Sequence, residues 1–407
     1  MNPFAPEVKA CPYPFYDKVR ETESVQWSSE IEAWLVTSHE HALAVLTDNA
    51  TYSSRNVTSG ASELDAEFPS LINSDGARHK QLRGLVAKAF TPRTLDSLWE
   101  PRIRQTANDL LDLVEGKAVF DVIADLAPLP GRITAEIIGV EPERSEDLKR
   151  WSDEIVMMAG LQDEDSSNED RDVELGPRGE GAFAQLSIYL EGILANRKAA
   201  PRDDLVTRLI AAEVDGVHLT DYEIIDFPVL LIVSGNDAVA DLIATGVRAL
   251  IMQPELIARL RGQPDLIGDL VEEALRWESP FQCFYRRATI PAELGGKEIK
   301  PGDALLVLYA AANRDPQQFA SPAEFNIARG RRDHLAFGMG AHYCLGANLA
   351  RLQARVAIAS IIERFESLAE VEGFEQQWRN APFFRELVEY PVTFKLRNPD
   401  RKLPPGA

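Results

Sequence analysis

The longest apolar run of the chain, residues 221–252, predicts a helix that crosses the hydrophobic core. Apolar residues occupy nearly every face of a helix over residues 224–233, and again over residues 242–250. A helix that is apolar all round is buried, whereas a surface helix carries a single apolar stripe. The run is interrupted by the polar residues 234–237. A polar break in a buried helix is either a candidate site or an accident of packing.

Apolar residues elsewhere recur mostly with helical spacing. Leu82, Val86 and Phe90 fall on one face of a helix that begins near residue 80. Residues 268–278 have the same period, and a last long helix ends near residue 366. The periodicity therefore predicts helices over most of the chain.

Strand-forming residues gather in three places. Residues 25–37 predict a short hairpin, residues 284–310 predict short strands with glycines at the turns, and residues 390–396 alternate as a final strand. We therefore predict a mainly α fold with a small β part. We expect this fold to be a single domain over residues 1–407.

One stretch has almost no apolar residues. Residues 163–180 carry aspartate and glutamate at close intervals. This composition favours a solvated loop, because it offers too little apolar surface to bury. Two interpretations stay open: a surface loop without function, or a lid over an active site.

Composition narrows the class of protein. With 407 residues, 45% of them hydrophobic and 26% charged, the chain can bury a large core and a bulky ligand. A net charge of -21 argues against general nucleic-acid binding, which needs a basic footprint. No apolar run reaches about 18 residues, and the start of the chain lacks the pattern of a secretory signal. Neither a membrane span nor export is expected.

Cysteine usage bears on the cellular compartment. Cys11, Cys283 and Cys344 do not make a disulfide framework, so a cytoplasmic location is the expectation. We also expect a monomer. Of the three cysteines, Cys344 stands out because glycines surround it.

Cys344 lies in a loop whose composition suits a metal ligand. Residues 337–346, FGMGAHYCLG in one-letter code, precede the last long helix. The glycines allow a tight loop with backbone N–H groups turned inward. A cysteine at a helix N-terminus should have a lowered thiol pKa, and a thiolate is a tunable iron ligand. Gly346 leaves room for a flat ring over the helix end.

This loop resembles the haem-binding loop of the cytochrome P450 superfamily, written F-G-x-G-x-H-x-C-x-G. The resemblance extends over about residues 10–396 and implies the single-domain, mainly helical fold of soluble bacterial-type members. It implies that Cys344 is the axial ligand to the iron of haem b, and that Phe337, Gly338 and Gly346 contact this cofactor. The implied enzyme is a monooxygenase that activates dioxygen and hydroxylates a C–H bond.

Glu273 and Arg276 match the E-x-x-R helix of the same superfamily. At this spacing the two side chains lie on one side of a helix and can interact. In the superfamily the pair binds a later arginine, for which Arg329 is the best candidate in this chain. The resemblance gives all three a structural role on the haem side of the core.

The carboxylates of haem need cations or strong hydrogen-bond donors. The resemblance points to His79 and Arg83 on successive turns of one helix, to Arg286, and to His342 within the cysteine loop. For any one of them alone, a surface position is the alternative.

The polar break in the long helix departs from the superfamily pattern. Members commonly have A-G-x-[D/E]-T there, whereas residues 234–238 of this chain read SGNDA. The resemblance makes Asp237, Ala238 and Ser234 the residues beside bound dioxygen. The acid and alcohol of the usual pattern help to deliver protons, but the side chain of Ala238 cannot hydrogen-bond.

Three accounts of the missing alcohol stay open. A hydroxyl or carbonyl group of the substrate orders the water, or Ser234 does so from one turn earlier on the same face. Alternatively, oxygen activation is poorly coupled or serves a reaction that depends less on this proton path. The first account is preferred.

The substrate pocket is placed by analogy with the superfamily. It draws on residues 56–73, the long helix, the loop after the Glu273 helix and the C-terminal turn. Most candidates are apolar, which predicts a hydrophobic small molecule such as a natural product, terpenoid or steroid-like compound. The individual candidates are Leu230, Val233, Gln282, Phe284 and Phe383.

Electrons are expected to arrive at a basic face. Residues 78–104 carry seven basic and two acidic side chains within an acidic chain, and residues 329–332 add a second basic cluster. Such a patch would steer an acidic electron donor. We expect NAD(P)H to supply electrons through ferredoxin reductase and a ferredoxin. Ordinary solvated helix faces are the alternative.

Two other classes of protein stay open. One is a haem-thiolate enzyme that performs oxidative coupling, ring formation or peroxide-driven oxidation without inserting oxygen, which Ala238 suggests. The other is a haem binder or gas sensor without catalysis, against which the absence of an attached signalling domain argues.

Overall fold

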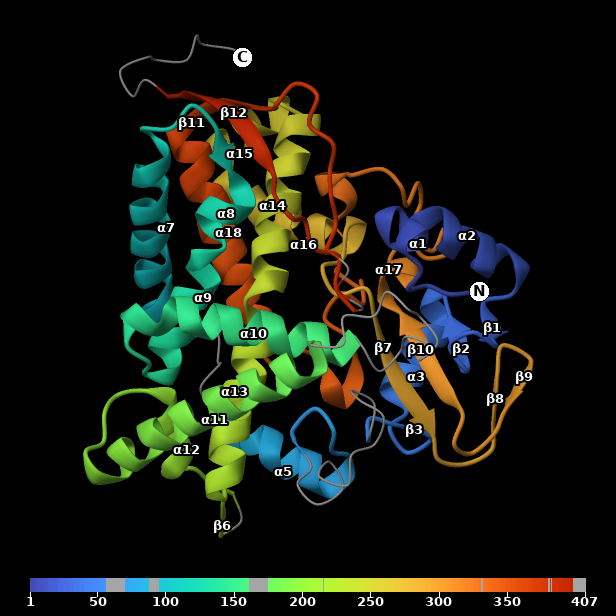
Figure 1. The fold of residues 1–407 in the computed structure, drawn as a ribbon. Coiled ribbons are helices and arrows are strands. Elements are labelled where there is room, and N and C mark those ends of the chain that lie inside the picture. The colour runs from blue at the N-terminus through green and yellow to red at the C-terminus, as the bar shows by residue number, and fades with distance from the viewer. Residues whose placement is uncertain are drawn as a thin grey trace.

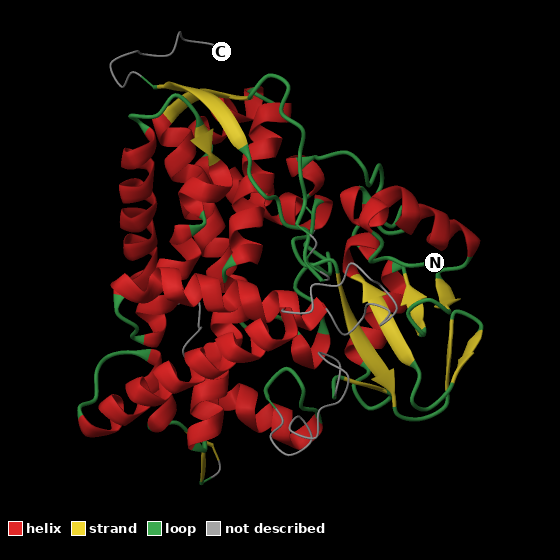
Figure 2. Ribbon diagram, viewed as in Figure 1, coloured by secondary structure: helices red, strands yellow, loops and turns green. Residues whose placement is uncertain are grey.

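Helices form the larger part of the molecule, and a smaller region rich in strands lies beside them with the N-terminal helices (Figure 1). Figure 2 separates the two kinds of element by colour. The prediction of a mainly α fold with a small β part is confirmed. The computed structural model describes residues 1–55, 70–87, 95–160, 175–214, 216–330, 332–379, 381 and 383–397.

The helices follow one another along most of the chain. Those before the long apolar run are α1 (Pro6–Ala10), α2 (Pro12–Thr22), α3 (His39–Thr47), α5 (Gly76–Ala87), α7 (Glu100–Val114), α8 (Val122–Leu126), α9 (Pro128–Ile138), α10 (Ser145–Gly160), α11 (Leu175–Ala199) and α12 (Leu205–Ile210). Those from the run onward are α13 (Asp221–Gly235), α14 (Asp237–Met252), α15 (Glu255–Gly262), α16 (Ile267–Trp277), α17 (Tyr309–Ala312) and α18 (Ala347–Arg364).

The strands form one five-stranded sheet in the order β1-β2-β10-β7-β3, a three-stranded sheet in the order β11-β12-β4, and two small pairs, β5-β6 and β8-β9. They are β1 (Val25–Ser28), β2 (Ala33–Val36), β3 (Tyr52–Ser53), β4 (Phe120–Asp121), β5 (Glu213–Val214), β6 (Val217–His218), β7 (Cys283–Ala288), β8 (Ala292–Leu294), β9 (Lys297–Ile299), β10 (Ala304–Leu308), β11 (Phe365–Glu370) and β12 (Pro391–Leu396).

The predicted hairpin over residues 25–37 is confirmed as β1 and β2, which pair antiparallel with Val25 opposite Val36. β10 then pairs parallel with β2, placing Leu306 opposite Leu35. Both leucines are fully buried, because this part of the sheet lies within a hydrophobic core. The strands predicted over residues 284–310 and 390–396 are confirmed as well.

The long apolar run is buried as predicted, but it forms two helices placed end to end. α13 starts at a capping box, in which Thr220 and Glu223 satisfy each other's backbone N–H groups. Asn236 separates α13 from α14, so the expectation of one uninterrupted helix was wrong at its middle. The low helix propensity of Gly235 agrees with a break at this point.

By length and composition, Asp221–Met252 is the one stretch of the described chain that could cross a membrane. However, 61% of the most apolar 18-residue part of this stretch is buried inside the protein. A core helix has this property, and the burial agrees with the expectation from the sequence.

Two hydrophobic cores meet at the loop that precedes α18. One core lies among the helices and the other around the five-stranded sheet. Ala336 belongs to the helical core and Leu335 to the sheet core. Farther along the loop, Leu345 packs on the helical core and Met339 on the sheet core. The loop is therefore anchored from both sides, which fixes the position of the residues between.

The acidic segment 163–180 was predicted to be a loop throughout. Its last residues instead belong to the first turns of α11, which begins at Leu175. From this point the chain continues as α11, which packs on α10 and α13. The rest of the segment lies outside the described residues.

Candidate functional site

The loop around Cys344 is closed by backbone hydrogen bonds. The amide of Cys344 donates to the carbonyl of Phe337 at 2.9 Å, and the amide of Gly338 donates to the carbonyl of Leu335 at 2.9 Å. Gly346 caps the first turn of α18, which starts at Ala347. Cys344 is therefore held just before a helix N-terminus, as the sequence predicted.

Two glycines of the loop have backbone angles that other residues rarely adopt. The φ of Gly338 is 66° and the φ of Gly340 is 74°, in the left-handed region that favours glycine. A Cβ on Gly340 would lie 2.4 Å from the carbonyl oxygen of Leu46 on α3. Close approach of two backbones, and not only the turn, therefore requires glycine here.

The thiol of Cys344 opens onto a cavity, where it is accessible. Burial among protein atoms on its other sides raises the pKa of this thiol. The backbone N–H groups of Gly346 and Ala347 and the guanidinium of Arg83 act in the opposite direction but are outweighed. The helix end therefore lowers the thiol pKa as predicted, while burial, which the sequence did not reveal, acts more strongly in the other direction.

The cavity beside Cys344 has a volume of about 270 Å³. It is lined by residues of both the helical core and the sheet core. The polar lining residues and those of the cysteine loop include His79, Arg83, Arg286, His342, Cys344 and Gly346. The apolar walls include Leu71, Ile72, Phe227, Leu230, Leu231, Val239, Leu242, Phe281 and Phe284.

All four predicted carboxylate-binding residues line this cavity. The rings of His79 and His342 lie 4.0 Å apart, and His342 Nε2 is 3.4 Å from Asp75 Oδ1. Burial, and then the nearby charge of His342 and Arg83, lowers the pKa of His79 to about 4. His79 is therefore uncharged at neutral pH and can serve as a hydrogen-bond donor.

Two of these donors are buried without a partner among the described residues. They are Nε2 of His79 and Nε of Arg286, whose side chains belong to residues that are 3% and 4% exposed. A buried donor left unpaired costs about 1–3 kcal/mol, so a site with such donors suits an anionic or carbonyl group. The other guanidinium, of Arg83, donates to the carbonyl of Tyr343 inside the same loop.

This set of residues fits haem b. The cavity offers a cysteine thiol, and cationic and neutral donors that match two carboxylates. A Cβ built on Gly346 would meet only the sulfur of Cys344, at 4.0 Å, so a flat ring has room over the helix end. Phe337 and Gly338, which the sequence also pointed to, line the same cavity.

The structural trio predicted from the sequence is assembled beneath the cavity. Arg276 donates to both carboxylate oxygens of Glu273, each at 2.8 Å, and Arg329 Nε lies 3.3 Å from Glu273 Oε1. Arg276 also donates to the carbonyl of Asn313 at 3.0 Å. Arg276 is 1% exposed and Glu273 is 3% exposed. This buried network joins α16 to the chain that follows β10.

A second buried acid, which sequence reasoning missed, ties α16 to the cysteine loop. Glu272 accepts hydrogen bonds from Arg351 Nε at 2.6 Å and Arg351 Nη2 at 3.0 Å, and lies 3.1 Å from His334 Nε2. Arg351 also donates to the hydroxyl of Tyr343 at 2.9 Å. Two adjacent glutamates in an otherwise apolar stretch of helix were the signal that could have revealed Glu272.

Gln353 and Tyr309 were also missed. Both line the cavity, and both are buried. The side-chain oxygen of Gln353, 2% exposed on α18, has no partner among the described residues. A single amide at an otherwise apolar position of the last helix was the available signal.

The distal side of the cavity is formed by the helix break. Ser234 and Ala238 line the cavity with Gly235, whereas Asp237 points toward α10, where Lys149 Nζ lies 3.0 Å from its Oδ1. The hydroxyl of Ser234 donates to the carbonyl of Leu230 at 2.6 Å. Its oxygen can still accept a hydrogen bond, but its proton is committed to the helix.

Of the predicted pocket residues, Leu230 and Phe284 line the cavity, but Val233, Gln282 and Phe383 do not. The face of α13 that lines the cavity runs through Phe227, Leu231 and Ser234, which are spaced by four and three residues, and Val233, directly before Ser234, points away from it. Gln282 turns to the other side, where its Oε1 accepts from the hydroxyl of Tyr16 at 3.2 Å.

Phe383 packs instead within an aromatic cluster, with its ring centroid 5.6 Å from that of Phe284. It therefore supports the wall from behind. The sequence also proposed residues 56–73; Leu71 and Ile72 line the cavity, and residues 56–69 lie outside the described chain. The proline of the C-terminal turn, at position 382, lies outside it as well.

The predicted basic face is partly neutralised. Arg78 pairs with Glu223, Arg102 with Glu136, and Arg104 with Glu100. In the second cluster Arg329 is used in the buried network, and Arg332 lies 3.4 Å from Asp269. Lys80 is exposed, while positions 88, 93 and 331 lie outside the described residues.

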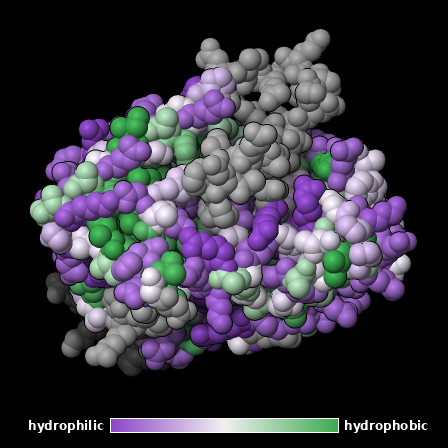
Figure 3. All heavy atoms as spheres, turned by 90° about the horizontal axis from the view of Figure 1, so that it is seen from below, coloured by the Kyte–Doolittle hydropathy of each residue, from purple (hydrophilic) through white to green (hydrophobic). Residues whose placement is uncertain are grey.

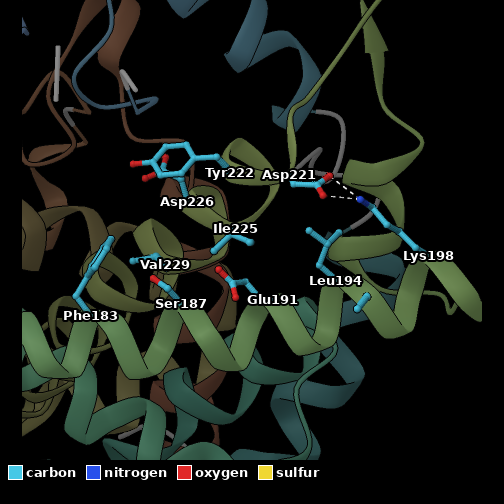
Figure 4. Close-up of a pocket in the computed structure, with 11 residues that line it drawn as sticks. Phe183, Ser187, Glu191, Leu194, Lys198, Asp221, Tyr222, Ile225, Asp226 and Val229 are labelled. Carbon is cyan, nitrogen blue, oxygen red and sulfur yellow. Dashed lines mark hydrogen bonds and ion pairs between the residues drawn. The ribbon is translucent and has the colours of Figure 1, made fainter. Parts of the chain in front are cut away.

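A second cavity, about 520 Å³, lies on the surface between α11 and α13. Figure 4 shows Phe183, Leu194 and Glu191 on α11 facing α13, with Lys198 bound to Asp221 at 2.6 Å. From below, the surface is mainly hydrophilic, with hydrophobic residues gathered toward the left (Figure 3). The lining residues include no cysteine or histidine, so the chemistry expected from the sequence is concentrated at Cys344.

Comparison with known proteins gives one consistent result. A sequence model described as "Cytochrome P450" matches residues 185–381. The biotin biosynthesis cytochrome P450 of Bacillus subtilis (strain 168) is 36% identical over 392 residues, which is 94% of this chain and 96% of that protein.

Two solved structures have the same fold. CYP109E1 from Bacillus megaterium, in complex with testosterone, has a TM-score of 0.85 and 33% identity, covering 95% of this chain and 98% of the other. P450BioI, in complex with an acyl carrier protein ligated to hexadec-9Z-enoic acid, has a TM-score of 0.86 and 33% identity, covering 96% and 99%.

Proposed function

The chain belongs to the cytochrome P450 family, and from this premise we propose that it hydroxylates a hydrophobic small molecule with dioxygen. The substrate class is a natural product, a terpenoid or a steroid-like compound. Electrons come from NAD(P)H through ferredoxin reductase and a ferredoxin. The enzyme works as a monomeric, single-domain protein in the cytoplasm.

The observation that carries this proposal is the meeting of a cysteine thiol, carboxylate-binding side chains and apolar walls in one cavity. Haem b, when bound there, supplies the activation of dioxygen. Cys344 would ligate its iron. Arg83, Arg286 and His79 would bind its carboxylates, since all three line the cavity and Nε2 of His79 and Nε of Arg286 have no other partner among the described residues.

The apolar walls support a hydrophobic substrate. Leu230, Leu231 and Phe227 come from α13, and Phe281 and Phe284 come from the region that leads into β7. Burying such walls against a ligand contributes about 25 cal/mol per Å² of apolar surface. The relative bound to testosterone and the relative bound to a fatty-acyl group support the same class.

Proton supply on the distal side depends on Asp237 and on the substrate. The methyl group of Ala238 faces the cavity and cannot order water, and the proton of Ser234 is already donated to Leu230. A hydroxyl or carbonyl group of the substrate takes the place of the missing alcohol. Asp237, held by Lys149, is the nearest acid of the helix break.

The same observation at Ala238 favours a second candidate function, which is oxidative coupling, ring formation or peroxide-driven oxidation without oxygen insertion. A reaction of this kind depends less on proton delivery at the distal side. Product analysis under isotopically labelled dioxygen distinguishes the two, because only hydroxylation places labelled oxygen in the product.

The test is an optical titration of the ferric, haem-loaded protein with steroids, terpenes, macrolides, fatty acids and cyclic dipeptides. A ligand that displaces water from the iron shifts the haem absorption band. We expect a saturable shift from one class with hydrophobic members, followed by hydroxylated product when ferredoxin, its reductase and NAD(P)H are added. A haem-loaded protein that binds none of these compounds and yields no product would contradict the proposal.

A further inference from the structure

Two buried carboxyl groups lie beside the distal helix break. Asp241 follows Asp237 by one turn of α14, and Glu386 lies in the C-terminal segment that packs on this helix. Asp241 is 6% exposed and Glu386 is 5% exposed. Oε1 of Glu386 has no hydrogen-bond partner within the part of the chain that the structure describes. A carboxyl in such a place is disfavoured as an anion.

Backbone contacts hold this pair in place. The amide of Leu387 donates to Asp241 Oδ1 at 3.1 Å, which fastens the C-terminal segment to α14. The amide of Arg379 donates to the carbonyl of Glu386 at 2.8 Å, and Trp378 and Leu387 form an antiparallel bridge. The two carboxyls are thus brought together by paired backbone, and not by a free surface loop.

Charges from two other places surround the pair. On α10, Lys149 Nζ lies 3.0 Å from Asp237 Oδ1 and also binds Asp153. In the C-terminal segment, Arg379 Nη1 lies 3.7 Å from Asp153 Oδ2. The described cluster therefore contains Asp153, Asp237 and the buried pair on the acidic side, against Lys149 and Arg379.

Ionisation of every acid would leave excess negative charge in a buried place. Burial, and then the charge of Asp237, raises the pKa of Glu386 to about 8. Burial, and then the charge of Glu386, raises the pKa of Asp241 well above its ordinary value. Burial also raises the pKa of Asp153, against the opposing charge of Lys149. Glu386 is therefore mainly protonated around neutral pH, and burial favours the protonated form of Asp241 as well.

We propose that Asp241 and Glu386 store a proton and pass it to Asp237, the acid of the helix break, whose neighbours Ser234, Gly235 and Ala238 line the distal side of the cavity. The inference rests on the proposed function, because a proton-consuming reaction must take place there. In the transfer, the O–H bond of the protonated carboxyl group breaks, and a new O–H bond forms on the carboxylate of Asp237. The carboxylate left behind is reprotonated by a hydronium ion from bulk solvent at the outer edge of the cluster, which leaves water, and no electron moves.

The placement of the groups suits this path. Asp237 and Asp241 are four residues apart on one helix, a spacing that puts neighbouring side chains about 5–6 Å apart at their Cβ atoms. At the outer edge, the side chains of Asp153 and Arg379 are 32% and 38% exposed, so solvent reaches the cluster there. Asp241 is three residues from Ala238 on α14, the position where alanine replaces the usual alcohol.

The test uses the haem-loaded enzyme and three variants. Glu386→Gln and Asp241→Asn keep the shape of each side chain but remove its acidic proton. Glu389→Gln is the matched control, since this exposed acid lies three residues from Glu386. Two acid variants are used so that the experiment stands even if one of them fails to fold.

The first readout does not need turnover. Infrared difference spectra, recorded as the pH rises through about 8, follow the carbonyl stretch of protonated carboxylic acid. We expect the wild-type enzyme and Glu389→Gln to lose a buried acid band that is absent from Glu386→Gln. An identical band in all variants would overturn proton storage. Because this readout needs no substrate, it gives an answer even if the proposed function fails.

The second readout is the ratio of hydroxylated product to peroxide as a function of pH. In the wild-type enzyme this ratio should fall as the store empties above about pH 8. Glu386→Gln should have a lower ratio that no longer changes over that interval. An active Glu386→Gln enzyme with the wild-type ratio at every pH would overturn the transfer to Asp237.

Discussion

Gly340 and Leu46 approach each other so closely that a Cβ on the glycine would lie 2.4 Å from the carbonyl oxygen of the leucine. This contact joins the cysteine loop to the end of α3, which belongs to the sheet core. The loop therefore cannot move outward without breaking a contact between two backbones. The position of Cys344 depends on this contact as well as on its own hydrogen bonds.

Gly340→Ala should destabilise the protein and weaken haem retention. The φ of 74° adds strain of about 1–2 kcal/mol for any residue with a Cβ, and the clash with Leu46 adds to it. Gly296→Ala is the matched control, because Gly296 has a φ of 73° but no atom within 4 Å of its Cβ position. Urea unfolding of both variants measures the difference. Equal losses of stability in the two variants would show that the contact with Leu46 is unimportant.

Cys344→Ser should abolish stable thiolate-type haem binding and hydroxylation. A serine hydroxyl is a poor iron ligand compared with a thiolate. The measurement is haem content per protein, together with the absorption spectrum of the reduced carbon monoxide complex. Cys11→Ser is the control, because Cys11 is exposed and lies far along the chain from the cavity loop. A Cys344→Ser protein with an unchanged spectrum would contradict ligation by this residue.

Much of this site could be predicted because several of its key residues lie in short sequence motifs. The loop of Cys344 and the pair Glu273 and Arg276 each stand in a short pattern, and the resemblance that they carry pointed to the donors His79 and Arg286. The structure brings Cys344 and both donors to one cavity. The fold class followed equally from the period of the apolar residues.

The errors came from side-chain direction and from long-range packing. Gln282 precedes β7 and its side chain is bound by the hydroxyl of Tyr16, so only Phe284, within the strand, lines the cavity. Asp241 and Glu386 are far apart in sequence, and only the docking of the C-terminal segment reveals that they form a pair. No spacing rule relates such residues.

Glu273→Ala should cost about 3–5 kcal/mol of folding free energy, because it leaves the guanidinium of Arg276 buried without its carboxylate. Arg276 would keep its backbone partners, which do not neutralise its charge. Urea unfolding of the purified variant measures the loss. Glu363→Ala, at an exposed position of α18, provides the comparison and should change stability little. A similar small change in Glu273→Ala would contradict the structural role of the trio.

Ala238→Thr should change the ratio of hydroxylated product to peroxide with the native substrate. The new hydroxyl would face the cavity on α14 and could order water where the substrate is proposed to do so. The ratio is measured by product analysis and peroxide assay in the same reaction. If the ratio is unmoved, the missing alcohol is immaterial to proton supply in this enzyme.

The pH dependence of stability should contain a contribution from Glu272. Burial opposes its ionisation, but hydrogen bonds from His334 and Arg351 and the charge of Arg351 lower its pKa from 4.5 to about 2. A lowered pKa in the folded state means that the carboxylate stabilises the fold above pH 4.5. That stabilisation is lost as the pH falls toward 2, and it amounts to roughly 3 kcal/mol.

Glu272→Gln should therefore unfold with a smaller dependence on pH over this acid interval, while being less stable than the wild-type protein at neutral pH. Glutamine keeps the size of the side chain but leaves the half-buried guanidinium of Arg351 beside a neutral group, which is costly in itself. The measurement is urea unfolding at several pH values for both proteins. Parallel pH curves for the two proteins would mean that Glu272 does not lose a stabilising charge in acid, whatever the difference in their stability at neutral pH.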